Sequence, residues 1–307
     1  MREIVIPLAT GLAIFLFGMQ VLRLGLARLT GNRLQKWLYQ FTQTPFIGFL
    51  TGLVATVVLQ SSSAVTVIII GFINTKVMRF SQTIGLLLGT NVGTCVTTEL
   101  LAVSIEKHAL FLLLTGVACL VLPWANLRFI GLAVAGLGCI FLGMQAMASV
   151  AGSFERIGFF DFVSTSNSTL AGVLIGTLFS AVIQSSSATI ALMMGLYHAH
   201  AVTLPFALAV VLGSNVGTCV TAWIAAVGGD REGKQIALAH LLINAVGLLA
   251  FYPLTPYIAD WLGGTTLTRY AQVAHFQTGF NAISALLLLP FSHALARFVG
   301  RLLPTSS

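Results

Sequence analysis

The chain has 307 residues, of which 57% are hydrophobic and only 7% are charged, and its formal net charge is +7. A soluble domain carries about a quarter charged residues, so this composition excludes an ordinary soluble protein. The Lys and Arg residues lie in the breaks between apolar runs, where they orient membrane helices, so the positive charge predicts topology and gives no reason to expect a nucleic-acid partner.

Apolar runs follow one another along the whole chain, and many are long enough to cross a hydrocarbon core of about 30 Å as helices. Because they do not alternate polar and apolar residues, they predict an all-α integral membrane protein and not a β-barrel. The first run, 4–22, is expected to be a span and not a signal peptide, since no small-residue cleavage site follows it.

The predicted elements form two similar series. In the first series, the run at 4–22 is followed by two short apolar arms and two spans, at 46–59, 64–73, 81–104 and 109–124. In the second, a span is followed by two short arms and two further spans, at 129–148, 169–183, 188–197, 203–227 and 236–252. An extra apolar segment at 272–290 and a short basic tail come last.

Two sequence motifs occur twice with the same spacing. QSSSA at 60–64 recurs at 184–188, and GTNVGTCVT at 89–97 recurs as GSNVGTCVT at 213–221, in both cases 124 residues later. Two long matches at one spacing indicate a duplication.

The duplication predicts two equivalent membrane repeats. We expect the first over 1–127, the second over 128–252, and a C-terminal span with a basic tail over 253–307. The arms are too short to cross singly, because about 14 residues at 1.5 Å each reach about 21 Å. Each pair of arms is therefore either a re-entrant hairpin with QSSS at its tip or one broken span. Re-entrant hairpins leave three spans per repeat, and an odd number inverts the second copy in the membrane.

The QSSS tips concentrate polar side chains where a helix ends inside the membrane. Free backbone N–H groups at the positive end of a helix dipole bind anions, whereas carbonyl, hydroxyl and amide oxygens suit a hard cation such as Na⁺. We therefore expect an oxyanion and cations together at the two tips, formed by Gln60, Ser61, Ser62, Ser63, Gln184, Ser185, Ser186 and Ser187. The second motif adds candidate cation ligands, namely Asn91, Thr94, Thr97, Asn215, Thr218 and Thr221.

Glu99 lies within a predicted span, and a carboxylate there indicates a functional role by default. It could bind a coupling cation or a proton, or it could extend to the interface beside Glu106 and Lys107. The tandem serines suggest a nucleophile, but no convincing base and acid accompany them, so we expect no enzyme.

The remaining polar residues point to structural roles. His240 with Asn244, and His275 with Asn281, favour hydrogen bonds between helices over ligand binding. The cysteines are scattered through apolar stretches, so we expect neither a disulfide nor a transition-metal site, and no cofactor; they are Cys95, Cys119, Cys139 and Cys219.

The paired QSSS motifs, each followed by G-[ST]-N-V-G-T, resemble the type II sodium-dependent phosphate cotransporter family over nearly the whole chain. The Ala239-His240 pair with Asn244, and Phe280-Asn281, resemble the end of each half in that family. The resemblance implies inverted repeats, QSSS at hairpin tips, and symport of inorganic phosphate with Na⁺. It also implies that Gln60, Gln184 and Ser214 join the sodium ligands. Many bacterial relatives carry a PhoU-like domain after the membrane part, whereas we expect a member of the family without one here.

We therefore expect a multi-pass protein of the cell inner membrane that carries phosphate and Na⁺ by alternating access. Phosphate export, or transport of another small oxyanion or carboxylate, is an alternative, and a passive anion channel or a non-transporting membrane sensor is another. Because no Arg or Lys lies in either motif, phosphate is expected to be held mainly by N–H and O–H donors. The oligomeric state stays open, with a homodimer among the alternatives.

Overall fold

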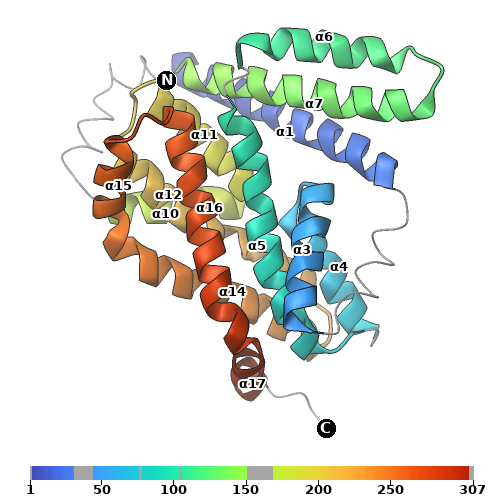
Figure 1. The fold of residues 1–307 in the computed structure, drawn as a ribbon, viewed down its shortest axis with the longest axis vertical. Coiled ribbons are helices and arrows are strands. Elements are labelled where there is room, and N and C mark those ends of the chain that lie inside the picture. Colours follow the sequence, from blue (N-terminus) through green and yellow to red (C-terminus); the bar gives the residue numbers. More distant parts are fainter. Residues whose placement is uncertain (1, 31–43, 76–77, 104–105, 151–168, 304–307) are drawn as a thin grey trace.

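The computed structural model describes residues 2–30, 44–75, 78–103, 106–150 and 169–303, which fold mainly into helices (Figure 1). Residues 2–120 contain α1 (Arg2–Thr30), α3 (Pro45–Leu59), α4 (Ser62–Asn74), α5 (Phe80–Ala102), η1 (Glu106–His108) and α6 (Ala109–Leu120). Residues 125–251 contain α7 (Ala125–Ala148), α10 (Thr169–Ile183), α11 (Ser186–His198), α12 (Leu204–Thr218), α13 (Val220–Ala226) and α14 (Arg231–Phe251). Then follow η2 (Tyr252–Leu254), α15 (Thr255–Gly263), α16 (Arg269–Leu288), η3 (Leu289–Phe291) and α17 (Ser292–Leu302).

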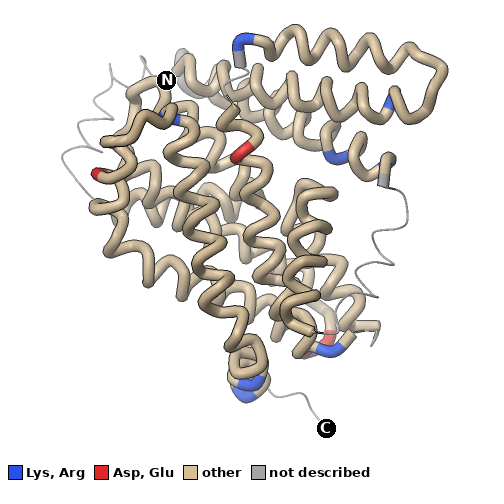
Figure 2. Tube along the Cα trace, viewed as in Figure 1, with Lys and Arg blue, Asp and Glu red and all other residues tan. Residues whose placement is uncertain are grey.

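Six helical segments of the described chain are long and apolar enough to cross a membrane, which confirms the predicted all-α membrane fold. They are Val5–Leu29, Phe80–Ala102, Ala125–Ala148, Leu204–Ala226, Arg231–Gly263 and Arg269–Leu302. Figure 2 shows few charged positions along them. The four predicted arms are the short helices α3, α4, α10 and α11. Their re-entry into a bilayer stays a prediction.

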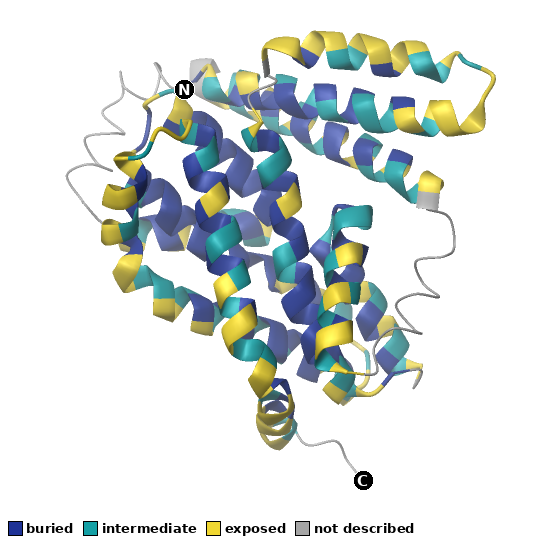
Figure 3. Ribbon diagram, in the orientation of Figure 1, coloured by how far each residue is buried: buried dark blue, intermediate teal, exposed yellow. Residues whose placement is uncertain are grey.

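The predicted span at 109–124 is wrong in length. The helix there, α6, has 12 residues, and at 1.5 Å per residue it reaches only about 18 Å. It ends before Pro123, whose ring is incompatible with a continuing helix. Together with α1 and α7 it forms a layer beside the remaining helices (Figure 1). The outer face of α6 is exposed and apolar, with Phe111 and Leu114 among its residues, which suits contact with lipid (Figure 3).

Close helix pairs support the two QSSS segments. α3 packs on α5, and α10 packs on α12, with glycines at the contacts. A Cβ atom at Gly89 would lie 2.0 Å from the carbonyl oxygen of Phe49, and one at Gly213 would lie 2.0 Å from that of Val173. Because there is no room for a side chain, the two backbones of each pair touch directly. Each QSSS segment is therefore held against the helix that carries the second motif of its own repeat.

The C-terminal elements repeat the layout of the elements before them. A long helix, a 3₁₀ turn and a short helix occur as α14, η2 and α15, and again as α16, η3 and α17. Gln235, Asn244 and Pro253 recur 37 residues later as Gln272, Asn281 and Pro290. The segment predicted to be an extra span therefore has a counterpart in α14, and the predicted basic tail is the helix α17. The repeat boundaries at 127 and 252 stay predictions.

Candidate anion site

Both QSSS motifs form the turn between two short helices. Gln60 and Gln184 adopt left-handed backbone conformations, with φ angles of 50° and 58°, and end α3 and α10. Ser61 and Ser185 are the N-caps of α4 and α11. Their Oγ atoms accept hydrogen bonds from the backbone N–H three residues later, at 3.1 and 3.2 Å. The repeated sequence thus produces the same local structure twice.

The two turns line a single cavity of about 450 Å³. Ser61 and Ser63 reach it from the first turn, Gln184 and Ser185 reach it from the second, and Thr221 reaches it from α13. Apolar side chains of α1, α4 and α13 complete much of the wall. The structure therefore brings together the two motifs that lie 124 residues apart in the sequence.

Both α4 and α11 begin at this cavity. The first backbone N–H groups of a helix have no acceptor within the helix, and the helix dipole is positive at this end. Each capping serine satisfies one of these N–H groups through its Oγ, and its own hydroxyl hydrogen stays available to a bound molecule. Two helix N-termini at one cavity favour an anion over a cation.

Arg23 on α1 adds a positive charge to the cavity, a role that no sequence motif indicated. Its Nε donates a hydrogen bond to the backbone oxygen of Gln60 at 3.0 Å, and the side chain lines the cavity. Among the described lining residues it is the only charged one. The expectation that N–H and O–H groups are the main donors to the anion stays a prediction, to which the structure adds one guanidinium at the cavity. The sequence shows only a basic residue near the end of an apolar run, which equally fits topology.

The two tip glutamines have different surroundings. Gln60 is 7% exposed: its Oε1 accepts a hydrogen bond from Thr97 Oγ1 at 2.8 Å, and its Nε2 donates to the Val57 carbonyl at 2.7 Å. Gln184 is exposed and lines the cavity, and its side chain has no hydrogen-bond partner among the described residues. Gln60 therefore braces its turn, whereas Gln184 is available to a bound molecule.

The other tip serines and most candidate sodium ligands lie outside the cavity lining. Ser62, Ser186 and Ser187 are buried in the first turns of α4 and α11. The buried hydroxyls of Thr94, Ser214 and Thr218 donate to backbone carbonyls about one turn earlier, at 2.7 to 2.9 Å. A hydroxyl that donates in this way keeps oxygen lone pairs for a cation.

Two candidate ligands are instead engaged with other helices. The side-chain nitrogens of Asn91 and Asn215 donate to Asn244 and Asn281, at 2.9 and 3.1 Å, which confirms the contacts between helices that were expected for Asn244 and Asn281. The amide oxygens of Asn91 and Asn215 have no hydrogen-bond partner within the part of the chain that the structure describes. Thr221 Oγ1 donates to the backbone oxygen of Thr218 at 2.8 Å and lies 3.2 Å from Ser63 Oγ of the first turn.

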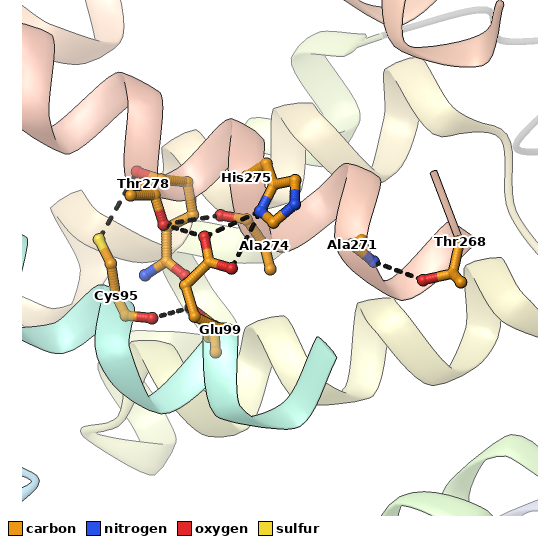
Figure 4. Close-up of polar contacts among 9 residues, drawn as sticks. Cys95, Glu99, Thr268, Ala271, Ala274, His275 and Thr278 are labelled. Carbon is orange, nitrogen blue, oxygen red and sulfur yellow. Dashed lines mark hydrogen bonds and ion pairs between the residues drawn. The ribbon is translucent and has the colours of Figure 1, made fainter. Parts of the chain in front are cut away.

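Glu99 lies outside the cavity lining and joins α5 to α16 (Figure 4). Its carboxylate is 2.9 Å from Nδ1 of His275 and also accepts a hydrogen bond from Thr278 Oγ1. The side chains of Glu99 and His275 are 31% and 47% exposed. Glu99 thus supports a helix contact, and a role in ion coupling stays a prediction.

The described residues contain no group of three or more His, Cys, Asp or Glu side chains that could hold a metal ion. All four cysteines are free thiols. The polar groups at the cavity are a guanidinium, hydroxyl groups, an amide and two helix N-termini, which suit an anion.

Comparison with known proteins agrees with this chemistry. The family model described as Na+/Pi-cotransporter matches residues 14–149 and 161–287. The Bacillus subtilis (strain 168) relative named "Uncharacterized protein YqeW" is 35% identical over 292 residues, which cover 94% of this chain and 95% of that protein. No solved structure matches this chain.

Two further relatives have names that refer to phosphate. "Putative inorganic phosphate export protein YjbB" of Escherichia coli (strain K12) is 26% identical over 294 residues, which cover 95% of this chain but 54% of that protein. "Sodium-dependent phosphate transport protein 2B" of Homo sapiens is 35% identical over 86 residues, which cover 27% of this chain and 12% of that protein. Since the family model covers both copies of the duplicated motifs, the chain belongs to the Na+/Pi-cotransporter family.

Proposed function

We propose that this protein is a sodium-coupled transporter of inorganic phosphate and that it binds phosphate between its two QSSS turns. The family supports phosphate as the substrate. The observation that carries the proposal is the cavity at which Arg23 and two helix N-termini meet. A guanidinium forms strong, paired hydrogen bonds to phosphate oxygens. The hydroxyl groups of Ser61 and Ser185 supply further donors, one from each repeat.

Sodium supplies the remaining positive charge in this proposal. A phosphate dianion in a site of low dielectric needs more compensation than one guanidinium provides. Oxygen atoms of the tips and of the second motifs are the proposed sodium ligands: Gln60, Gln184, Asn91, Thr94, Thr97, Ser214, Asn215, Thr218 and Thr221. Because each ion favours binding of the other, phosphate and Na⁺ load cooperatively.

The duplicated architecture supports alternating access. Two inverted repeats with interrupted helices at the substrate site form a recurrent design of secondary transporters. In this proposal the two QSSS turns are the tips of re-entrant hairpins, and the loaded core moves against, or is gated by, the remaining helices, so that the cavity opens to each side of the inner membrane in turn.

Phosphate export is a second candidate function. The Escherichia coli relative that aligns with 95% of this chain is named for export, whereas the human relative named for sodium dependence aligns with 27%. The same cavity would serve either direction, because the gradients of the coupled ions decide which way a carrier runs.

Uptake of radiolabelled phosphate into proteoliposomes tests both candidates. An inward Na⁺ gradient is compared with matched K⁺ and choline gradients, and vesicles loaded with phosphate report export. Saturable uptake that depends on Na⁺ supports the symporter, and export without such uptake supports the second candidate. Competition by arsenate, sulfate and small carboxylates defines the anion. Absence of phosphate flux in both directions, with folded and inserted protein, would contradict the proposed function.

A further inference from the structure

A closed ring of hydrogen bonds joins the two copies of the second motif. Asn91 Nδ2 on α5 donates to Asn244 Oδ1 on α14 at 2.9 Å. Asn244 Nδ2 lies 3.2 Å from the Sγ atom of Cys219, the residue that joins α12 to α13. Cys219 Sγ in turn donates to the backbone oxygen of Asn215 at 3.4 Å. These three contacts connect the first repeat to the second.

Three equivalent contacts return from the second repeat to the first. Asn215 Nδ2 donates to Asn281 Oδ1 at 3.1 Å, and Asn281 Nδ2 lies 3.5 Å from Cys95 Sγ. Cys95 Sγ donates to the backbone oxygen of Asn91 at 3.6 Å, where the path began. All donors point the same way round the ring. Each half of the ring is the pseudo-symmetric copy of the other, since its members are related by the 124-residue and 37-residue repeats.

The ring lies in the interior of the molecule. Cys95, Cys219, Asn244 and Asn281 are at most 3% exposed, and Asn215 is 8% exposed. The amide nitrogens of Asn244 and Asn281 each donate one hydrogen to a backbone oxygen within their own helix, at 3.1 and 3.0 Å. The sulfur is the partner of the second hydrogen, and although thiols are weak acceptors, a buried N–H without a partner is costly. The ring therefore ties together α5, α12, α14 and α16, which are separated in the sequence.

The ring is connected to the anion cavity through close helix packing. A Cβ atom at Gly52 of α3 would lie 2.2 Å from the carbonyl oxygen of Leu86 on α5, and one at Gly176 of α10 would lie 2.3 Å from that of Val210 on α12. Contacts this tight prevent α3 from sliding on α5, or α10 on α12. Because α3 and α10 end at the two QSSS turns, the position of α5 relative to α12 decides the position of one turn relative to the other.

We infer that Cys95, Cys219, Asn244 and Asn281 are positioning residues of the anion site, and that their ring sets the separation of the two QSSS turns. None of the four lines the cavity, so they act on a bound anion through geometry and not through contact. The identity of that anion rests on the proposed function, whereas the ring itself does not.

Cysteine substitutions provide a matched test. Cys95→Ala and Cys219→Ala each open the ring at one position, and the corresponding serine variants keep a donor and an acceptor. Cys119→Ala and Cys139→Ala are controls, because these two thiols lie outside the ring. Each variant is purified as the full chain, reconstituted into proteoliposomes and assayed with radiolabelled inorganic phosphate.

The alanine variants of the ring are expected to raise the KM for phosphate by about three- to tenfold, the cost of losing one set of buried contacts. The serine variants should recover part of this loss, and the controls should match the wild type. The double variant Cys95→Ala/Cys219→Ala should resemble the more affected single variant, since an open ring cannot be opened again.

Wild-type KM values in both single alanine variants of the ring would overturn the inference, and so would effects that multiply in the double variant. If the wild-type protein carries no phosphate, the proposed function fails, and the ring is then judged from thermal unfolding of the same purified proteins. If the decreases in melting temperature of the two single variants add in the double variant, the inference that the ring acts as one unit is overturned. Decreases that do not add would support it.

Discussion

The two QSSS turns share one sequence and one backbone conformation, yet they differ in what surrounds them. Gln60 is buried and bonded to Thr97, whereas Gln184 is exposed at the cavity. Arg23 binds the first turn, but the equivalent position in the second repeat, 125 residues later, is Ala148. A duplicated motif can therefore provide the same local fold twice and still acquire two roles. The first turn is braced by its neighbours, and the second is open to a bound molecule.

Equivalent threonines show the same divergence. Thr97 donates to Gln60 within its own repeat, while Thr221, 124 residues later, reaches across to Ser63 of the other repeat. α5 is continuous over Phe80–Ala102, whereas the corresponding segment is interrupted at Cys219 between α12 and α13. The second repeat thus lines the cavity with its own turn and with Thr221 beside the first turn, whereas the first repeat supplies the charged residue, Arg23.

Removing the charge should give the largest effect. Arg23→Leu is expected to lower the initial rate of phosphate uptake by about 100-fold or more, because the anion loses its charged partner in a site of low dielectric. Arg23→Lys should retain part of the rate, since Lys keeps the charge but not the paired geometry. Arg28→Leu, an exposed arginine on the same helix, is the control. Uptake by Arg23→Leu at the wild-type rate would exclude Arg23 from the anion site.

Removing the capping serines tests what the two turns have in common. Ser61→Ala and Ser185→Ala each lose an N-cap, which costs about 1 kcal/mol, and a hydroxyl donor to the anion. We expect each to reduce kcat/KM for phosphate by about tenfold, and by similar amounts. Ser149→Ala, at an exposed position beyond the end of α7, should have no effect. A large loss for one serine alone would show that only one turn binds the anion.

Replacing the tip glutamines tests what separates the turns. Gln60→Ala leaves Thr97 without its acceptor and should lower the free energy of unfolding by about 1–3 kcal/mol. Gln184→Ala should leave stability unchanged and raise the KM for phosphate by about threefold, the scale of one lost neutral hydrogen bond. Melting temperature and the KM for phosphate are measured on both variants, with Ser149→Ala as the control. The reverse pattern would contradict the assignment of a braced and an open turn.

Glu99→Gln should give the smallest effect. Glu99 pairs with His275, and neither side chain lines the cavity. We expect less than about a twofold change in the KM for phosphate and in the Na⁺ dependence of uptake. A lost Na⁺ dependence or an altered voltage response would instead make Glu99 part of the coupling mechanism.

Local sequence determined the helices and the turns of this protein. The predicted arms at 46–59 and 169–183 match α3 and α10 to within one residue, because apolar runs bounded by polar residues define helices without reference to distant parts of the chain. The identical QSSS segments likewise predict identical turns, since a left-handed residue and a serine cap are local features. The length of α6 was missed, because Pro123 ends it before the apolar run ends.

Tertiary structure alone decided which polar groups meet. Arg23 and Gln60 are 37 residues apart in the sequence, and the Asn91–Asn244 contact spans 153 residues. No local pattern encodes such contacts, because they depend on which helices pack together and on how far a long side chain reaches. The sequence by itself thus specified two turns of the same local structure. The packing of α1 against the first turn decided where the charge lies. The packing of α14 and α16 between the repeats decided how the turns are held. Both depend on tertiary structure, since charges and hydrogen bonds act over a few ångströms in space.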